Sequence, residues 1–324
     1  MKQAIINAFY VNSKTKGTEA VDVKALPALE NENDYFWIQL DFSVSESRKI
    51  IQSLHDNEII TSALVKDDSR PRVSVYPDEL LLVVRGMNLL KGEKPENMIS
   101  VRILATKSLI ITCQKKSLNS IDSIVEDMKQ NKAPESTGDF IIRLNERIVF
   151  NMGDTMEGIE EEAILMEETT MDDNSNDEKN KTELYSLRRQ IIQLKRYLIP
   201  QRDALSKLQI EKTSWMTNKQ QARLREVSDY LMRYLEMLDA AREIASVSQE
   251  TMINRSNEQI NNRMYLLSII AALFLPLSFF TGLLGVNLAG IPQANHPMAF
   301  TWFIVVLLVV VAFQFWLFWR KKWL

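Results

Sequence analysis

The chain is poor in the residues that build disulfides and metal centres. Its 324 residues include one cysteine, Cys113, and two histidines, His55 and His296. A single cysteine cannot form an internal disulfide, and no CxxC pair or Cys/His cluster exists to hold a structural zinc. Cys113 follows an apolar run at 109–111, which predicts a buried thiol in a β-strand. His55 lies near the end of a predicted helix, and we interpret it as a capping or surface residue.

Other absences exclude whole classes of function. The net charge is only −3, with 42 acidic and 39 basic residues. The chain therefore has no excess of positive charge for nucleic acid. It contains no GxxxxGK[ST] sequence, the phosphate-binding loop of many nucleotide hydrolases. We also find no pairing of nucleophile and base in the sequence. We therefore predict that the protein is not an enzyme, needs no cofactor and does not bind nucleic acid.

The most informative absence is that of charge near the C-terminus. No Asp, Glu, Lys or Arg occurs from Met264 to Trp319. Two apolar runs in this stretch, at about 264–284 and 299–319, each have about 21 residues, or roughly 31 Å as helix, which matches a bilayer core. Neither run has a wide polar face, so we favour two membrane spans over a buried hairpin in a soluble protein. Pro276 lies within the first run, and a proline there requires neighbouring helices to satisfy the carbonyl that it frees.

The charges that flank the two runs predict their orientation. Arg255 and Arg263 precede the first run, basic residues fill positions 320–322 after the second, and the connecting loop at about 285–298 has no charge. Because positive residues collect on the cytoplasmic side, we expect both termini in the cytoplasm and the short loop outside.

The polar front of the chain divides into two parts. Residues 1–135 combine predicted strands with helices, and residues 136–263 are predicted to form a helical stalk before the spans at 264–324. In the stalk we expect helices at about 138–170, 182–214 and 217–284, of which the last runs unbroken into the membrane because it has no Gly or Pro from Thr217 to Leu275. The strands, rich in branched and aromatic residues, are predicted at Ala4 to Val11, Tyr35 to Phe42, Arg72 to Tyr76, Leu80 to Asn88, Ile99 to Ala105 and Ser108 to Gln114.

The predicted helix that enters the membrane carries a polar seam. Positions that a coiled coil would fill with Leu or Ile hold small and polar residues instead. A water-filled axis among several copies of the helix explains this pattern, and so does tight packing of small residues between helices. The sequence alone leaves both open. The two rows, read in steps of seven, are Glu250, Asn257, Met264, Ala271 and Ser278, and Asn254, Asn261, Ser268, Leu275 and Gly282.

The end of the first span carries a family resemblance. It reads FLPLSFFTGLLGVN over 274–287, and the chain ends in KKWL at 321–324. This resembles the CorA superfamily of two-span metal-ion transporters, in which Gly-Met-Asn ends the first span after an FxPLTF-like stretch. The present motif is Gly285-Val286-Asn287, and the following loop, LAGIPQANHPM, lacks the acidic element of the magnesium transporters. Both departures are closer to the ZntB zinc-transporter branch.

The resemblance implies a fold and an assembly. It implies an α+β cytoplasmic domain (an αβα sandwich), long coiled helices and two C-terminal spans, assembled as a homopentameric funnel in a bacterial inner membrane. Asn287 would head the ring at the pore entrance, and Gly285 and Val286 would shape its loop. The pore below would be lined by Ser278, Leu275, Ala271, Leu267, Met264 and Asn261, with Asn257 and Glu250 toward the cytoplasmic exit.

The function expected from this resemblance is transport of divalent cations, with zinc favoured. A ring of Asn287 amide oxygens offers neutral acceptors that suit a hydrated dication. His296 is interpreted either as an outer zinc ligand or as an incidental loop residue, and Glu250 as a cation ligand at the exit. Two alternatives remain: a Mg²⁺, Co²⁺ or Ni²⁺ channel of the same fold, and a two-span receptor or scaffold. The expected partners are the lipid bilayer, divalent cations and further copies of the chain.

Overall fold

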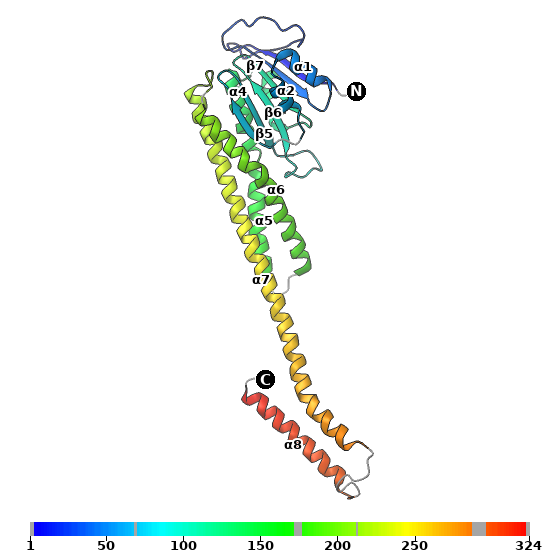
Figure 1. The fold of residues 1–324 in the computed structure, drawn as a ribbon. Coiled ribbons are helices and arrows are strands. Elements are labelled where there is room, and N and C mark those ends of the chain that lie inside the picture. Colours follow the sequence, from blue (N-terminus) through cyan, green and yellow to red (C-terminus); the bar gives the residue numbers. More distant parts are fainter. Residues whose placement is uncertain (1–2, 68–69, 172–176, 212, 287–295, 322–324) are drawn as a thin grey trace. The chain divides into compact units, whose positions relative to one another are not determined.

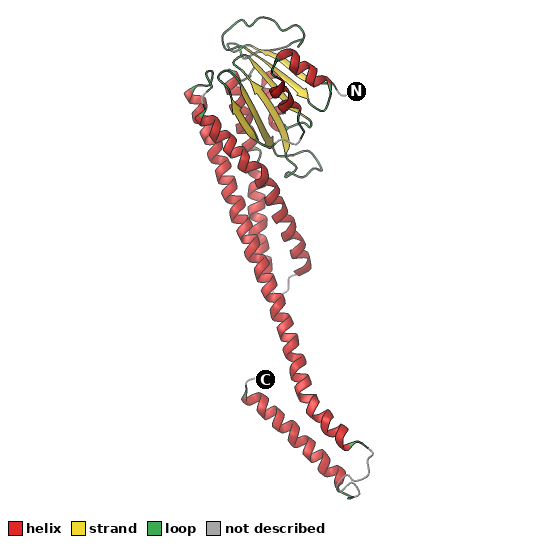
Figure 2. Cartoon of the chain, in the orientation of Figure 1, coloured by secondary structure: helices red, strands yellow, loops and turns green. Residues whose placement is uncertain are grey.

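The computed structural model describes the chain except for residues 1–2, 68–69, 172–176, 212, 287–295 and 322–324 (Figure 1). The chain divides into two compact units, Met1–Gln249 and Glu250–Leu324, which are considered separately below. The first unit contains a sheet with helices on both faces and three long helices (Figure 2).

The first unit is built on a seven-stranded mixed sheet in the order β2-β1-β3-β7-β6-β5-β4. The neighbours β3 and β7 are parallel, and the other neighbouring strands are antiparallel. Strands β3 and β5 are buried along their whole length, as expected where helices cover both faces of a sheet. The strands are β1 (Ile5–Val11), β2 (Thr18–Ala20), β3 (Tyr35–Asp41), β4 (Arg72–Val75), β5 (Leu80–Gly86), β6 (Ile99–Ala105) and β7 (Leu109–Gln114).

Helices α1 (Glu46–Leu54) and α2 (Glu58–Val65) cover one face of the sheet, where Ile51 and Ile60 join a fully buried core with Leu104. On the other face, α4 (Thr137–Phe150) places Phe140 against Trp37, with ring centroids 4.9 Å apart. Helix α3 (Asn119–Lys129) packs beside α4. The first part of the chain is therefore an αβα sandwich, as the resemblance implied.

The six predicted strands are confirmed, with ends that agree to within two residues. Cys113 is fully buried on β7, as predicted. His55 follows α1 as its C-cap residue, and its Nε2 lies 2.8 Å from Glu79 Oε1. Strand β2 and helix α2 were missed, although Asn57 gives a clear signal for α2: its side chain accepts hydrogen bonds from the N–H groups of Ile59 and Ile60.

The single helix predicted at about 138–170 is wrong. The chain forms two helices there, α4 and α5 (Gly153–Met171), with a break at Asn151 and Met152. The Asn151 N–H closes the end of α4 by bonding the carbonyl of Arg147. Its side-chain Nδ2 donates to Ser120 Oγ of α3 at 3.0 Å. The break thus follows from packing against a distant helix, which no local periodicity records.

Helices α6 (Asp177–Ile210) and α7 (Asn218–Leu284) run antiparallel within the first unit. Ser206 Oγ lies 3.5 Å from Ser228 Oγ, while Lys195, earlier in α6, forms an ion pair with Asp239, later in α7. In the sequence of α6, apolar residues at steps of three and four predict a seam for packing against a partner helix. Each of its five members is buried: Leu184, Leu187, Ile191, Leu194 and Leu198.

The buried carboxylate of Asp34, just before β3, accepts hydrogen bonds from the end of β1 and from the loop before β3. Asp34 is fully buried and accepts hydrogen bonds from the Tyr10 hydroxyl at 2.6 Å, from the Ser13 N–H and Oγ at 2.8 Å, and from Asn31 N and Nδ2 at 2.9 Å. Burial by itself raises the pKa of this carboxyl, but the hydrogen bonds to the ionised form outweigh it and hold the pKa well below its usual range.

Replacing Asp34 by asparagine is expected to destabilise the first unit by about 3 kcal/mol at pH 7, because an amide brings donors to a site that already holds five. Since the pKa is depressed in the folded state, the contribution is present above about pH 4 and fades as the pH falls. Thermal unfolding of both chains from pH 7 to pH 3 measures this as a shrinking difference in midpoint. Asp56→Asn, at an exposed position, is the control. A difference that stays constant with pH would contradict the role of the ionised carboxylate.

Candidate functional site

The second unit contains the C-terminal half of α7 and helix α8 (Ala299–Arg320), which folds back beside it (Figure 1). Both helices are long and apolar enough to cross a membrane. None of the most apolar window of α7 is buried, and only 6% of that of α8. A buried hairpin of a soluble protein would hide these residues, so their exposure favours the two predicted membrane spans.

The predicted pore-lining residues all lie on α7, and each is exposed within the single chain. They share one side of the helix because the steps between them are three, four or seven residues. The set comprises Glu250, Asn257, Asn261, Met264, Leu267, Ala271, Leu275 and Ser278.

Helix α8 faces the opposite side of α7. The less exposed positions in this part of α7 include Ile269, Leu273 and Leu277, spaced by four. Each residue advances about 100° around a helix. Ala271 therefore lies about 200° around the helix from Ile269, and Leu275 lies about 200° from Leu273, which places both on the opposite side. The buried residues of α8 are Gln314 and Phe318, also spaced by four. The structure therefore leaves the polar seam uncovered on the side of α7 away from α8.

Gln314 satisfies the carbonyl that Pro276 frees. Proline has no N–H, so the oxygen of Ala272, four residues earlier, loses its helical partner. Gln314 Nε2 of α8 donates to this oxygen at 3.3 Å. The side chain of Gln314 is only 9% exposed, and its Oε1 has no hydrogen-bond partner. The requirement predicted for Pro276 is thus met by the neighbouring span, and the responsible residue was not foreseen from the sequence.

The GVN motif begins where α7 ends. Gly285 and Val286 follow the last helical residue, whereas Asn287 lies outside the described residues. The Gly285 N–H donates to the Thr281 carbonyl at 2.9 Å. A Cβ at position 285 would approach that same carbonyl oxygen to 2.7 Å. The close approach explains why the first position of the motif needs glycine, since any side chain would push the chain off the helix end.

His296 is exposed, and its Nδ1 accepts a hydrogen bond from the Met298 N–H at 3.2 Å. In the neutral ring this bond places the proton on Nε2, so neither nitrogen presents a lone pair to a metal. Metal binding at His296 therefore requires this bond to open. Glu250 is exposed on α7. Within the described part of the chain, no three His, Cys, Asp or Glu side chains gather to hold a metal ion.

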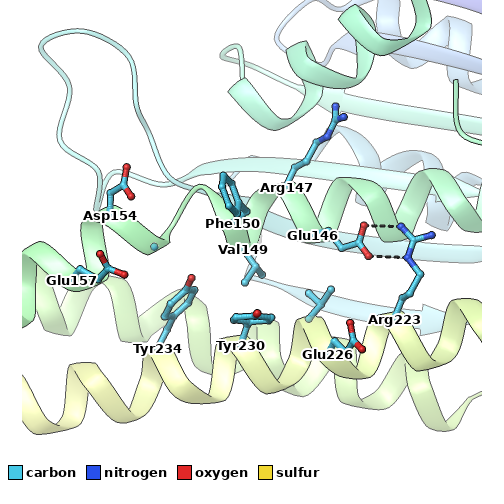
Figure 3. Close-up of a pocket in the computed structure, with 12 residues that line it drawn as sticks. Glu146, Arg147, Val149, Phe150, Asp154, Glu157, Arg223, Glu226, Tyr230 and Tyr234 are labelled. Atoms are coloured by element: carbon cyan, nitrogen blue, oxygen red, sulfur yellow. Dashed lines mark hydrogen bonds and ion pairs between the residues drawn. The ribbon is translucent and has the colours of Figure 1, made fainter. Parts of the chain in front are cut away.

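A further cavity lies elsewhere, between α4, α5 and α7 of the first unit (Figure 3). It measures about 560 Å³ and is lined by Phe150, Tyr230 and Tyr234 among others. Arg223 closes one end by donating to both carboxylate oxygens of Glu146, at 2.8 and 2.7 Å, and these bonds raise the pKa of its guanidinium. Phe150, 83% exposed, lies at the rim. The ion pair of Arg223 with Glu146 joins α7 to α4 at the end of the cavity. The sequence analysis did not predict this cavity.

Two exposed apolar helices, one with a polar seam that its partner leaves open, indicate a membrane transport protein. A family model confirms this class over most of the chain. The chain belongs to the family of CorA-like Mg²⁺ transporter proteins, whose model matches residues 32–322. The members of this family are divalent-cation transporters and not enzymes, as predicted.

Curated relatives agree with this assignment. The zinc transport protein ZntB of Pectobacterium atrosepticum is 32% identical over 289 residues, which cover 89% of this chain and 88% of that protein. The divalent cation transporter CmaX of Pseudomonas aeruginosa is 32% identical over 329 residues, covering 100% of this chain and 98% of its own.

Solved structures share the fold. The full-length CmaX structure superposes with a TM-score of 0.84 at 32% identity, covering 100% of this chain and 99% of that chain. The CorA magnesium transporter of Methanocaldococcus jannaschii gives a TM-score of 0.81 over 100% of both chains, and its 16% identity supports the fold alone.

Proposed function

We propose that this chain carries zinc across a bacterial inner membrane through the central pore of a homopentamer, with both termini in the cytoplasm. Under this proposal residues 1–135 form the cytoplasmic domain, 136–263 the stalk and 264–324 the spans. The observation that carries it is the exposed polar seam of α7 on the side away from α8. Two spans cannot enclose a pore, but several copies of α7 around one axis bring their seams together.

The chemistry of the proposed pore is that of neutral acceptors. No carboxylate occurs from Met264 to Trp319, so the spans offer no anionic group to grip a bare ion. A ring of Asn287 amides would bind the water shell of a dication, which is costly to remove. Met264 and Leu267 would form an apolar constriction that gates by dewetting. Inward movement of a dication down 100 mV releases about 4.6 kcal/mol, twice the value for a single charge.

We assign zinc rather than magnesium as the cargo for two reasons. The motif has Val286 where the magnesium transporters have methionine, and the loop at 288–298 lacks acidic residues. The curated ZntB relatives, at up to 32% identity, are named zinc transport proteins. The same fold with Mg²⁺, Co²⁺ or Ni²⁺ as cargo is the competing proposal, because the family model is named for Mg²⁺.

Flux into vesicles tests the cargo. The full chain reconstituted in liposomes is expected to move Zn²⁺ several-fold faster than Mg²⁺, as followed by entrapped fluorescent indicators. A panel with Co²⁺ and Ni²⁺, run with and without a pH gradient, also measures proton coupling. Faster Mg²⁺ than Zn²⁺ flux would overturn the zinc assignment, and no flux of any dication would favour a receptor or scaffold. Light scattering of the solubilised protein measures whether it is a pentamer.

A further inference from the structure

A buried arginine in the αβα sandwich has two guanidinium nitrogens without a hydrogen-bond partner among the described residues. Arg102 lies on β6 and is 1% exposed. Its Nε and Nη1 atoms are buried without a partner, and its guanidinium carbon lies 3.9 Å from the centre of the Phe42 ring. Guanidinium is a fork of five donors that stays protonated in proteins. Buried polar groups in folded proteins are almost always paired, so such a fork indicates an absent acceptor.

The fork lies at a cavity of about 300 Å³. Ser100 and Arg102 are two residues apart on β6 and so share one face of the sheet, and Arg85 lies opposite Ser100 on β5. All three line the cavity. The hydroxyl of Ser100 is also buried without a partner. The guanidinium of Arg102 and the hydroxyl of Ser100, both from β6, therefore line the same cavity with donors that have no partner.

The charge around this cavity is positive. Among the described residues that line it, Arg85, Arg102, Lys115 and Lys116 are basic and Asp67 is the one acidic residue. Arg85 is held by a bond from its Nη1 to the Met98 carbonyl at 3.0 Å. Burial lowers the pKa of Arg102 to about 10, which still leaves it charged at neutral pH. An anion would offset the cost of keeping this charge away from water.

We propose that this cavity, referred to below as the Arg102 pocket, binds a small oxyanion, such as inorganic phosphate or a carboxylate, held by the fork of Arg102 and the hydroxyl of Ser100. Planar or tetrahedral oxyanions accept two parallel N–H bonds from guanidinium, which chloride cannot do. The volume is large enough for a phosphate-sized group with its water. The site belongs to the first unit and is separate from the seam of α7.

Thermal unfolding of the full chain in detergent tests the pocket. Sodium phosphate, sulfate and acetate are compared with sodium chloride at equal ionic strength. We expect the unfolding midpoint to rise with phosphate or acetate and to saturate, and the better of the two to identify the ligand class. Arg102→Met is expected to lower the affinity at least tenfold while unfolding no earlier than wild type in chloride, because it removes an unpaired buried charge.

Two further variants make the test decisive. Arg48→Met removes the same charge at an exposed position and is expected to leave anion binding unchanged. Ser100→Ala is expected to weaken anion binding several-fold. This variant tests the same site if Arg102→Met does not fold. A wild-type midpoint equal in phosphate, acetate, sulfate and chloride would overturn the proposal and leave a pocket that holds only water. Full binding by Arg102→Met or Ser100→Ala would overturn it as well. Neither the unfolding midpoint nor the anion affinity depends on cation flux. The proposed anion site can therefore fail while the proposed transport holds, and the reverse.

Discussion

Asn287→Ala is expected to reduce zinc flux to the level of empty vesicles while leaving the oligomer intact. The proposed pore has no carboxylate from Met264 to Trp319, so neutral acceptors must recognise a hydrated dication at its mouth, and the proposed amide ring supplies them. Loss of that ring removes the amide acceptors at the mouth and leaves the hydroxyl of Ser278 and the apolar positions beneath it. Because position 287 follows the end of α7, the change is expected to leave the helix itself unaffected.

Flux and oligomeric state are measured on the same preparation. Asn262→Ala is the matched control, because residue 262 is an exposed asparagine of α7 outside the two rows of the seam. The control is expected to retain most of the wild-type flux. Wild-type flux in Asn287→Ala would refute the entrance ring, whereas dissociation of the oligomer would show that the residue acts in assembly.

Gln314→Leu is expected to destabilise the second unit by about 1 kcal/mol and to alter flux, because it leaves the Ala272 carbonyl without a donor in hydrocarbon. Pro276→Ala restores a backbone N–H to that same carbonyl. The double variant Gln314→Leu with Pro276→Ala is therefore expected to recover most of the lost stability. The pair forms a double-mutant cycle in which the coupling measures this one hydrogen bond.

Thermal unfolding in detergent and zinc flux measure the cycle. Thr281→Val supplies the control, since the Thr281 hydroxyl bonds carbonyls of its own helix, Leu277 at 2.9 Å and Ser278 at 3.1 Å. It is expected to show no coupling to Pro276. Additive effects of Gln314→Leu and Pro276→Ala would mean that Gln314 does not act through the freed carbonyl.

The bond from Gln314 also bears on how the proposed pore moves. It joins α8 to the point of α7 where the helical hydrogen-bond ladder is interrupted. The residues around this point include Ala271, Leu275 and Ser278 of the proposed pore lining. Loss of the Gln314–Ala272 bond is therefore expected to shift the pore-lining residues of α7. For this reason zinc flux is measured together with stability.

Local periodicity was enough to predict much of the chain. The six strands, the apolar seam of α6 and the two C-terminal apolar helices each follow a repeat of two, three or four residues, or an unbroken apolar run, and all were confirmed as elements. The need for a donor to the carbonyl freed by Pro276 follows from proline chemistry alone. The polar seam was also visible from the sequence, and the structure adds that α8 leaves it exposed.

Contacts between distant segments were decided only by the tertiary structure. The break between α4 and α5 depends on Ser120 of α3, the donor to Ala272 comes from Gln314 of α8, and the Arg102 pocket combines β5 with β6. Sequence patterns report which side of an element is apolar, because side chains repeat along one helix or strand. They do not report which element lies opposite, since that depends on strand order and helix packing. The sequence by itself therefore determined most of the elements and the two apolar helices, and the tertiary structure decided which buried polar groups find partners among the described residues and which, like Arg102, do not.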